Sequence, residues 1–322
     1  MYMEKKPQEF TTIEQQIELL KSRNLVFKSE KNAKIILESY GYYEIINGYK
    51  DFYVEKTNST ERYRDGITFE QIASLYSLDH SIRNQLIVTL LDLESHLRAA
   101  TSYVIAESFS STQSEYLKFS NYQNRSTKYK RFSLGSILDK FNKVAHSSKE
   151  PIKYHMDTYG NVPPWVLFKG IYLSDLVNFI RLLKPNEKEK LIHKIYSIPV
   201  ELIDTHLKNF FTDTLFMCLE YRNLAAHGDR IYNHIPKSII RVTSDSEKEL
   251  SELIPNFNHI NNSHSLGTLI YALSLFKKQE YVHSLQQVIE KEIKRHCSAY
   301  PDDLEYLLDS VGIASMVTIT RI

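Results

Sequence analysis

An arginine, an asparagine and a histidine lie close together in segment 221–227, and their side chains suit acid–base chemistry on a phosphate. Arg222 and Asn223 are adjacent, and His227 follows Arg222 by five positions. RNA can be cleaved without a metal ion when its own 2′-hydroxyl attacks the neighbouring phosphate. This reaction requires proton transfer, which a histidine of pKa near ~6.5 can provide. It also requires stabilisation of negative charge, which an arginine fork can provide.

Regular helix geometry alone does not bring Arg222 and His227 together. Five positions on an α-helix correspond to about 500°, so the two side chains point roughly 140° apart. The helix could unwind at His227, because Gly228 follows it. Alternatively, two copies of the chain could bring their motifs together around a two-fold axis. The second arrangement supplies two histidines, one to accept a proton and one to donate it.

Glu94 and Arg98 lie four positions apart in an earlier segment that is rich in leucine. Apolar residues recur there at steps of three and four, which predicts a helix with one core-facing stripe. The pair can be interpreted as an ion pair on the helix surface, worth a few tenths of a kcal/mol. It can equally be interpreted as support for the phosphate chemistry, and both interpretations stay open.

The segment 118–153 is the one distinctly basic stretch of a chain whose formal net charge is only +1. It contains nine Lys or Arg and two Asp or Glu, with aromatic residues between them. Such a run is usually a solvated face. However, cations interleaved with aromatics also suit single-stranded RNA, whose bases stack and whose phosphates are neutralised. The candidate RNA-binding residues are Arg125, Lys128, Lys130 and Arg131, with Arg230 beyond the motif.

The remaining composition excludes several classes of protein. The two cysteines, Cys218 and Cys297, are far apart, and the histidines lack metal-ligand spacing, so no metal site is expected. The glycine-rich phosphate loops, dinucleotide fingerprint and nucleophile elbow are missing from the sequence, so we expect no cofactor. The sequence shows neither a signal peptide nor about 20 consecutive apolar residues, which predicts a cytoplasmic protein without a membrane span.

The elements that must position these residues are expected to be helices. Glycine is sparse at 9 residues and tyrosine frequent at 22, which favours an all-α fold with aromatic seams. Capping boxes at Thr12 and Thr68 predict two helix starts, and Pro199 predicts the start of the helix that carries the motif. The run 41–53 is compatible with a strand or an irregular segment, and 56–65 with a linker. Aromatic side chains are expected mainly in packing contacts, namely Tyr42, Tyr43, Tyr49, Phe52 and Trp165.

Three regions follow from this pattern. Residues 1–65 form an N-terminal accessory region, residues 66–242 a helical core that carries the motif, and residues 243–322 a C-terminal helical region. The boundaries are expected to be correct to within several residues.

Several segments occur together, in order, around the motif. They are 12–20, 41–49, 76–83, 93–98, 163–166, 221–227 and 230–233. With these segments the chain resembles the bacterial Abi-like proteins of the abortive-infection AbiD/AbiF type, over roughly residues 12–233. That family carries a HEPN domain with an RxxxxH motif. The ordered set is far more specific than the motif alone.

The resemblance implies a HEPN-type helical bundle in which Arg222 and His227 are the catalytic pair. Asn223 would support them, and Glu94 or Arg98 would lie beside them. Many relatives have a second histidine directly after the first, and here that position is Gly228. HEPN nucleases generally dimerise through the helices that carry the motif, so this difference favours a homodimer with a shared site.

The function implied is that of a metal-independent endoribonuclease, acting in phage defence or as a toxin. The RNA products would end in a 2′,3′-cyclic phosphate, and an RNA or a protein antitoxin could restrain the enzyme. Two alternatives remain open. One is a non-catalytic RNA-binding module, and the other is a helical protein-interaction bundle.

Overall fold

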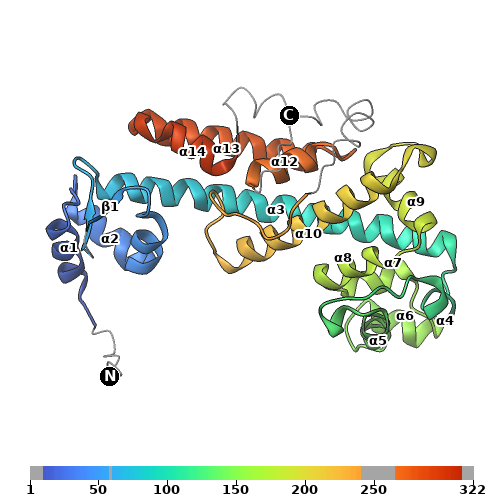
Figure 1. Ribbon diagram of the computed structural model, residues 1–322. Helices are drawn as coiled ribbons and strands as arrows, with labels where there is room; N and C mark the ends of the chain where they lie inside the picture. The colour runs from blue at the N-terminus through green and yellow to red at the C-terminus, as the bar shows by residue number, and fades with distance from the viewer. Residues whose placement is uncertain (1–9, 58–59, 241–264, 314–322) are drawn as a thin grey trace, which may run out of the picture. The chain divides into compact units, whose positions relative to one another are not determined.

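The computed structural model describes residues 10–57, 60–240 and 265–313. Helices form nearly all of its regular structure, which confirms the predicted all-α class (Figure 1). The described residues fall into two compact units. Unit 1 comprises those within 1–82 and 291–305, and unit 2 those within 83–290 and 306–322. The predicted region boundaries at 65 and 242 remain predictions.

Unit 1 begins with two short amphipathic helices, α1 (Ile13–Ser22) and α2 (Glu30–Tyr40). The predicted capping box at the start of α1 is present, because Thr12 and Gln15 exchange side-chain and backbone hydrogen bonds. The unit also contains the first part of α3 (Phe69–Ser108), the last part of α13 (Glu280–Ala299) and a 3-10 turn at Pro301–Asp303.

Two predictions for the segment between α2 and α3 are wrong. Part of the run 41–53 is helical, with a π-helical turn at Tyr43–Asn47. The expected linker 56–65 instead contributes to an antiparallel hairpin of β1 (Val54–Thr57) and β2 (Thr60–Tyr63). The hairpin is held in place because Tyr53 and Tyr63 bury their rings in the unit's core.

Only one of the two hydrogen bonds of the predicted capping box forms at the start of α3. The Gln71 backbone N–H donates to Thr68 Oγ1 at 3.2 Å, as expected. The Gln71 side chain does not return to the Thr68 backbone, because its Nε2 donates to both oxygens of Asp303. Gln71, near the beginning of α3, is therefore hydrogen-bonded to the segment 301–303 of the same unit.

Unit 2 is built from helices that pack around aliphatic and phenylalanine side chains. Its helices are the rest of α3 and of α13, α4 (Gln113–Tyr116), α5 (Leu134–Ala145), α6 (Ile152–Tyr159), α7 (Pro164–Leu167), α8 (Leu173–Arg181), α9 (Pro185–Tyr196), α10 (Thr205–His227), α12 (Leu266–Ser274) and most of α14 (Leu304–Val311). Short 3-10 turns lie at Phe119–Asn121, Lys130–Phe132, Phe168–Gly170 and Val200–Leu202.

Two further predictions need correction. Pro199 precedes a 3-10 turn, and the long helix α10 starts later, with Asp204 as its N-cap. The aromatic residues are not all packing residues. Tyr49 is 2% exposed, as expected, but Tyr43 is 79% and Trp165 51% exposed.

Candidate functional site

The motif occupies the last turns of α10, and the end of this helix is well defined. Gly228 follows His227 with a φ of +84°, a left-handed conformation that glycine adopts readily and that ends helices. The buried Arg83 side chain of α3 donates to the Gly228 carbonyl, and to the Asp229 carbonyl at 3.3 Å. Helices α3 (cyan) and α10 (gold) therefore meet at this end (Figure 1).

Glu94 of α3 is a second residue that contacts α10. One of its carboxylate oxygens accepts a hydrogen bond from Arg98, and the other lies 3.8 Å from Nε of Arg222. The Glu94 side chain is only 5% exposed, whereas those of Arg98 and Arg222 are 26% and 32% exposed. Arg98 also donates to the Ile171 carbonyl at 2.8 Å. Glu94 and Arg98 thus form the ion pair that their spacing predicts, but Glu94 is buried and does not lie on the helix surface.

The Arg222 guanidinium is oriented by charge but keeps unused donors. Its Nε is buried and has no hydrogen-bond partner among the described residues, since 3.8 Å is too long for one. The facing Glu94 oxygen is likewise buried without a hydrogen-bond partner in the described chain. Such an ion pair holds the arginine near a fixed position, and because the Arg222 side chain is 32% exposed, the part of its guanidinium that faces solvent can bind an oxyanion.

Asn223 and His227 differ from Arg222 because both are exposed. Helix α10 continues through His227, so the helix does not unwind before this residue. Within one chain the side chains of Arg222 and His227 consequently point in different directions. The structure brings Glu94, Arg98 and Arg222 together in one cluster, and it leaves His227 outside that cluster.

The predicted RNA-binding residues fall into two groups. Arg125, Lys128, Lys130 and Arg131 are exposed in the segment that leads to α5, whereas Arg230 lies three residues beyond α10 and is half-buried. Tyr129 is 54% exposed, and the cations of Lys128 and Arg131 lie 5.6 and 5.8 Å from its ring centre. No hydrogen bond or ion pair between described residues joins the segment 125–131 to α10.

Two cations that the sequence analysis missed lie against this basic segment. Arg181, the last residue of α8, donates to the carbonyls of Ser126 and Phe132 at 3.3 and 3.4 Å. Lys188 of α9 is 5% exposed, and its amine donates to the Arg181 carbonyl at 3.3 Å. The signal was present, because Lys188 shares the three- and four-residue spacing of the apolar residues of α9.

Burial, and to a smaller extent the nearby cations of Arg125, Arg181 and Lys208, lower the pKa of Lys188 to about 8. The pKa of Arg181 is also lowered, by burial and by Arg125. Of these cations, Lys208 has a carboxylate partner, Glu189, at 2.5 Å. An uncompensated group of cations is costly in a folded protein unless an anion binds there.

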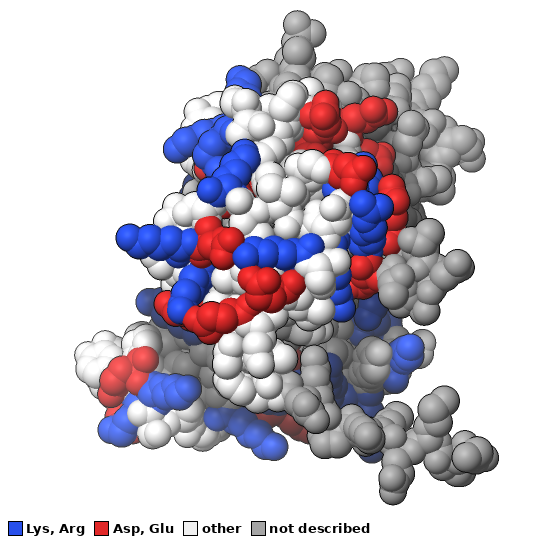
Figure 2. Space-filling model, turned by 90° about the vertical axis from the view of Figure 1, so that its left-hand side faces the viewer, with Lys and Arg blue, Asp and Glu red and all other residues white. Residues whose placement is uncertain are grey.

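On the face shown in Figure 2, Lys and Arg side chains alternate with Asp and Glu, and neither sign forms a continuous area. Ion pairs such as Lys21 with Glu18 and Lys34 with Glu14 join charges of opposite sign in unit 1. None of the described helices combines the length and apolar character that a membrane span requires.

These features define an all-helical protein with an arginine–carboxylate cluster at one helix crossing and an exposed histidine at the nearby helix end. The chain belongs to the Abi-like protein family, whose model matches residues 35–233. That range contains Glu94, Arg98 and the whole motif. Comparison with curated proteins and with solved structures found no match.

Proposed function

We propose that the protein is a metal-independent endoribonuclease of the HEPN class that acts in abortive infection. The observation that carries this proposal is the position of Arg222, whose side chain lies beside the buried Glu94 carboxylate and is still 32% exposed. Membership of the Abi-like family suggests the role in phage defence. A toxin restrained by an RNA or protein antitoxin is consistent with the same chemistry.

In this proposal each motif residue has one role. Arg222 binds the phosphate and stabilises the charge that develops on it. His227 transfers a proton to or from the reacting oxygens, because a neutral imidazole can accept a proton near neutral pH and an imidazolium can donate one. Asn223 binds the phosphate or the partner's motif. The product ends in a 2′,3′-cyclic phosphate because the 2′-hydroxyl is the nucleophile.

A homodimer would complete the site. His227 is exposed and lies outside the Glu94–Arg222 cluster, so a second copy could place its own His227 beside Arg222. Apolar residues near Glu94 are also exposed on α3, with Val88 at 52% and Leu91 at 46%. A second copy that covers this surface would bury it in a two-fold interface.

The cations near α8 and α9 would guide the RNA strand. Lys208 lies near the start of α10 and Arg222 near its end, which corresponds to about 20 Å along the helix at 1.5 Å per residue. Arg125, Arg181 and Lys188 would neutralise phosphates at the distant end of this path. The exposed Tyr129 ring would provide a surface on which a base can stack.

The decisive experiment incubates total RNA or transfer RNA, in EDTA, with the wild type and with Arg222→Ala and His227→Ala. We expect cleavage only by the wild type, with cyclic-phosphate ends that a ligase specific for them can capture. His146→Ala is the matched control, because His146 is also an exposed histidine at a helix C-terminus. This control variant should cleave like the wild type.

Two results would overturn the assignment. Equal cleavage by all four proteins would show a contaminating nuclease, and activity that disappears with EDTA would show a metal-dependent reaction. If no protein cleaves but RNA is bound in a salt-dependent manner, the non-catalytic RNA-binding alternative is correct. If the protein neither cleaves nor binds RNA, the helical protein-interaction bundle is the remaining alternative.

A further inference from the structure

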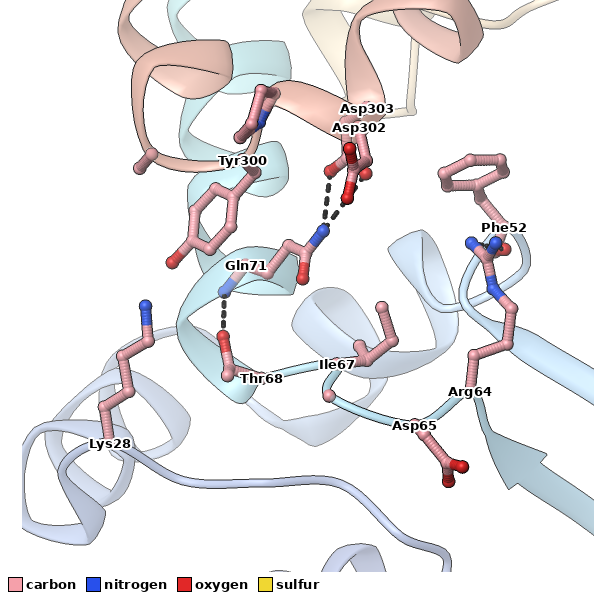
Figure 3. Close-up of a pocket in the computed structure, with 13 residues that line it drawn as sticks. Lys28, Phe52, Arg64, Asp65, Ile67, Thr68, Gln71, Tyr300, Asp302 and Asp303 are labelled. Carbon is pink, nitrogen blue, oxygen red and sulfur yellow. Dashed lines mark hydrogen bonds between the residues drawn. The ribbon is translucent and has the colours of Figure 1, made fainter.

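Unit 1 contains a pocket far from the motif in sequence, with a volume of about 540 Å³. Its walls come from the loop before α2, the end of the hairpin, the first turn of α3 and the segment 299–303. Figure 3 shows Gln71 in the middle of this pocket, Lys28 and Tyr300 on the left, Arg64 and Phe52 on the right, and Asp302 and Asp303 above. The volume is in the range of small-molecule sites.

Two cations line the pocket without a carboxylate partner among the described residues. The Arg64 guanidinium lies 4.6 Å from the Phe52 ring centre and donates one N–H to the Phe52 carbonyl at 2.7 Å. Its Nε is buried, and none of the residues that the structure describes forms a hydrogen bond with it. The Lys28 amine lies 5.0 Å from the Tyr300 ring centre. Both cations are positioned by aromatic rings and can still bind an anion.

Two of the three carboxylates in the pocket are already engaged. Asp303 is 2% exposed and accepts hydrogen bonds from Tyr53, Gln71 and His296 at 2.6 to 3.0 Å. Asp65 accepts hydrogen bonds from Asn24 at 2.8 Å and from Arg62 at 3.2 Å. Asp302 is exposed and is therefore the carboxylate that can accept hydrogen bonds from a ligand.

A ligand that satisfies these groups needs a negative charge, a flat ring and hydrogen-bond donors. Arginine binds phosphate through its N–H fork, and the outer face of its planar guanidinium can stack on a base. A carboxylate accepts hydrogen bonds from the amino groups of cytosine and guanine. We propose that this pocket binds a nucleotide, with its phosphate at Lys28 and its base between the Arg64 plane and Asp302.

This site goes beyond the proposed nuclease and can be tested separately from it. The experiment measures binding of CMP, GMP, UMP and inorganic phosphate to the full chain by calorimetry. CMP and GMP should bind more tightly than UMP, which has no amino group, and than phosphate. Arg64→Ala should weaken CMP binding about tenfold or more. Arg62→Ala is the matched control, since Arg62 lies two residues earlier and pairs with Asp65, and it should stay within about twofold of wild type.

Two further variants keep the test informative if Arg64→Ala fails to fold. Lys28 and Asp302 are exposed, so Lys28→Met and Asp302→Asn should fold normally. The first should weaken every nucleotide, and the second should weaken CMP and GMP but not UMP. Comparing CMP with a short single-stranded RNA distinguishes a free nucleotide from a nucleotide within a strand.

Three results would overturn the proposal. The first is that no nucleotide binds at about 1 mM. The second is that phosphate and CMP bind with equal affinity. The third is that the Arg62→Ala and Arg64→Ala variants lose equal amounts of CMP affinity. Arg222→Ala should bind nucleotide like the wild type. A wild-type protein that binds nucleotide but does not cleave RNA would therefore contradict only the nuclease proposal.

Discussion

Glu94 is a single buried carboxylate that compensates two arginines from different helices. A carboxylate in such a position lowers the cost of holding Arg98 and Arg222 close to each other. The four-residue spacing of Glu94 and Arg98 is visible in the sequence. The approach of Glu94 to Arg222 is not visible, because it depends on where α3 and α10 cross.

The first prediction concerns this carboxylate. Glu94→Gln should lower the free energy of unfolding by about 2 kcal/mol, because the two partly exposed arginines lose their shared counter-charge. Urea unfolding measures this change. Glu107→Gln is the control on the same helix, because Glu107 is 46% exposed and pairs with Lys190 at 3.4 Å. Its effect should stay within about 0.5 kcal/mol, and equal effects of the two substitutions would contradict the role given to Glu94.

The second prediction concerns Lys188, whose pKa is lowered from 10.5 to about 8. Between these values the unfolded chain binds more protons than the folded protein, so stability should rise as the pH increases above about 8. RNA affinity should fall over the same range, because the amine loses its charge. Melting temperatures and RNA binding at pH 7 and 9 measure both changes.

Lys188→Met provides the control for this titration. Its stability should lack the rise that the wild type shows above pH 8, and its RNA affinity should change less between pH 7 and 9. If wild type and Lys188→Met follow parallel pH profiles, Lys188 does not titrate in this range and does not contact phosphate.

At the scale of elements, most helices could be predicted from the sequence, because their apolar residues recur with the helical period. The β-hairpin of β1 and β2 could not be predicted. Its strands are four residues each and rich in charged or polar residues, so they resemble a linker. The beginning of α10 was misplaced because Pro199 suits both a helix start and the 3-10 turn that it precedes.

The third prediction concerns the contact between α12 and the end of α14. A Cβ atom at Gly267 would lie 2.2 Å from the Gly312 carbonyl oxygen, a backbone atom that cannot move freely. Gly267→Ala should therefore destabilise the protein by about 2 kcal/mol or more, as measured by urea unfolding. At Gly135 in α5 an added Cβ meets no atom within 4 Å. Gly135→Ala should be neutral or slightly stabilising, and similar destabilisation by both substitutions would contradict this explanation.

At the scale of the whole molecule, the sequence indicates which residues form the candidate site but not how it is completed. Arg222 and His227 follow directly from the motif. That they lie on different sides of an unbroken helix follows from the structure of α10. The cationic group at Arg181 and Lys188 was missed because it forms between a loop and two helices that are distant in sequence.

The fourth prediction tests whether two chains share the site. Arg222→Ala and His227→Ala are each inactive in the proposal, but a mixed dimer contains one site with both residues intact. After subunit exchange, an equal mixture should recover about one quarter of the wild-type cleavage rate, because half of the dimers are mixed and each has one intact site. A mixture that stays inactive, although mixed dimers are detected by mass spectrometry, would place the site within one chain.

The hydrogen bonds from Tyr53 and Gln71 to Asp303 bridge 250 and 232 positions of the chain. During synthesis the N-terminal segments leave the ribosome long before Asp303, so unit 1 cannot be completed until the chain has been translated beyond Asp303. Until then Tyr53 and Gln71 must remain solvated or form other contacts. A chain that ends prematurely after residue 233 would retain the motif but lack the wall formed by residues 299–303, and with it the nucleotide pocket.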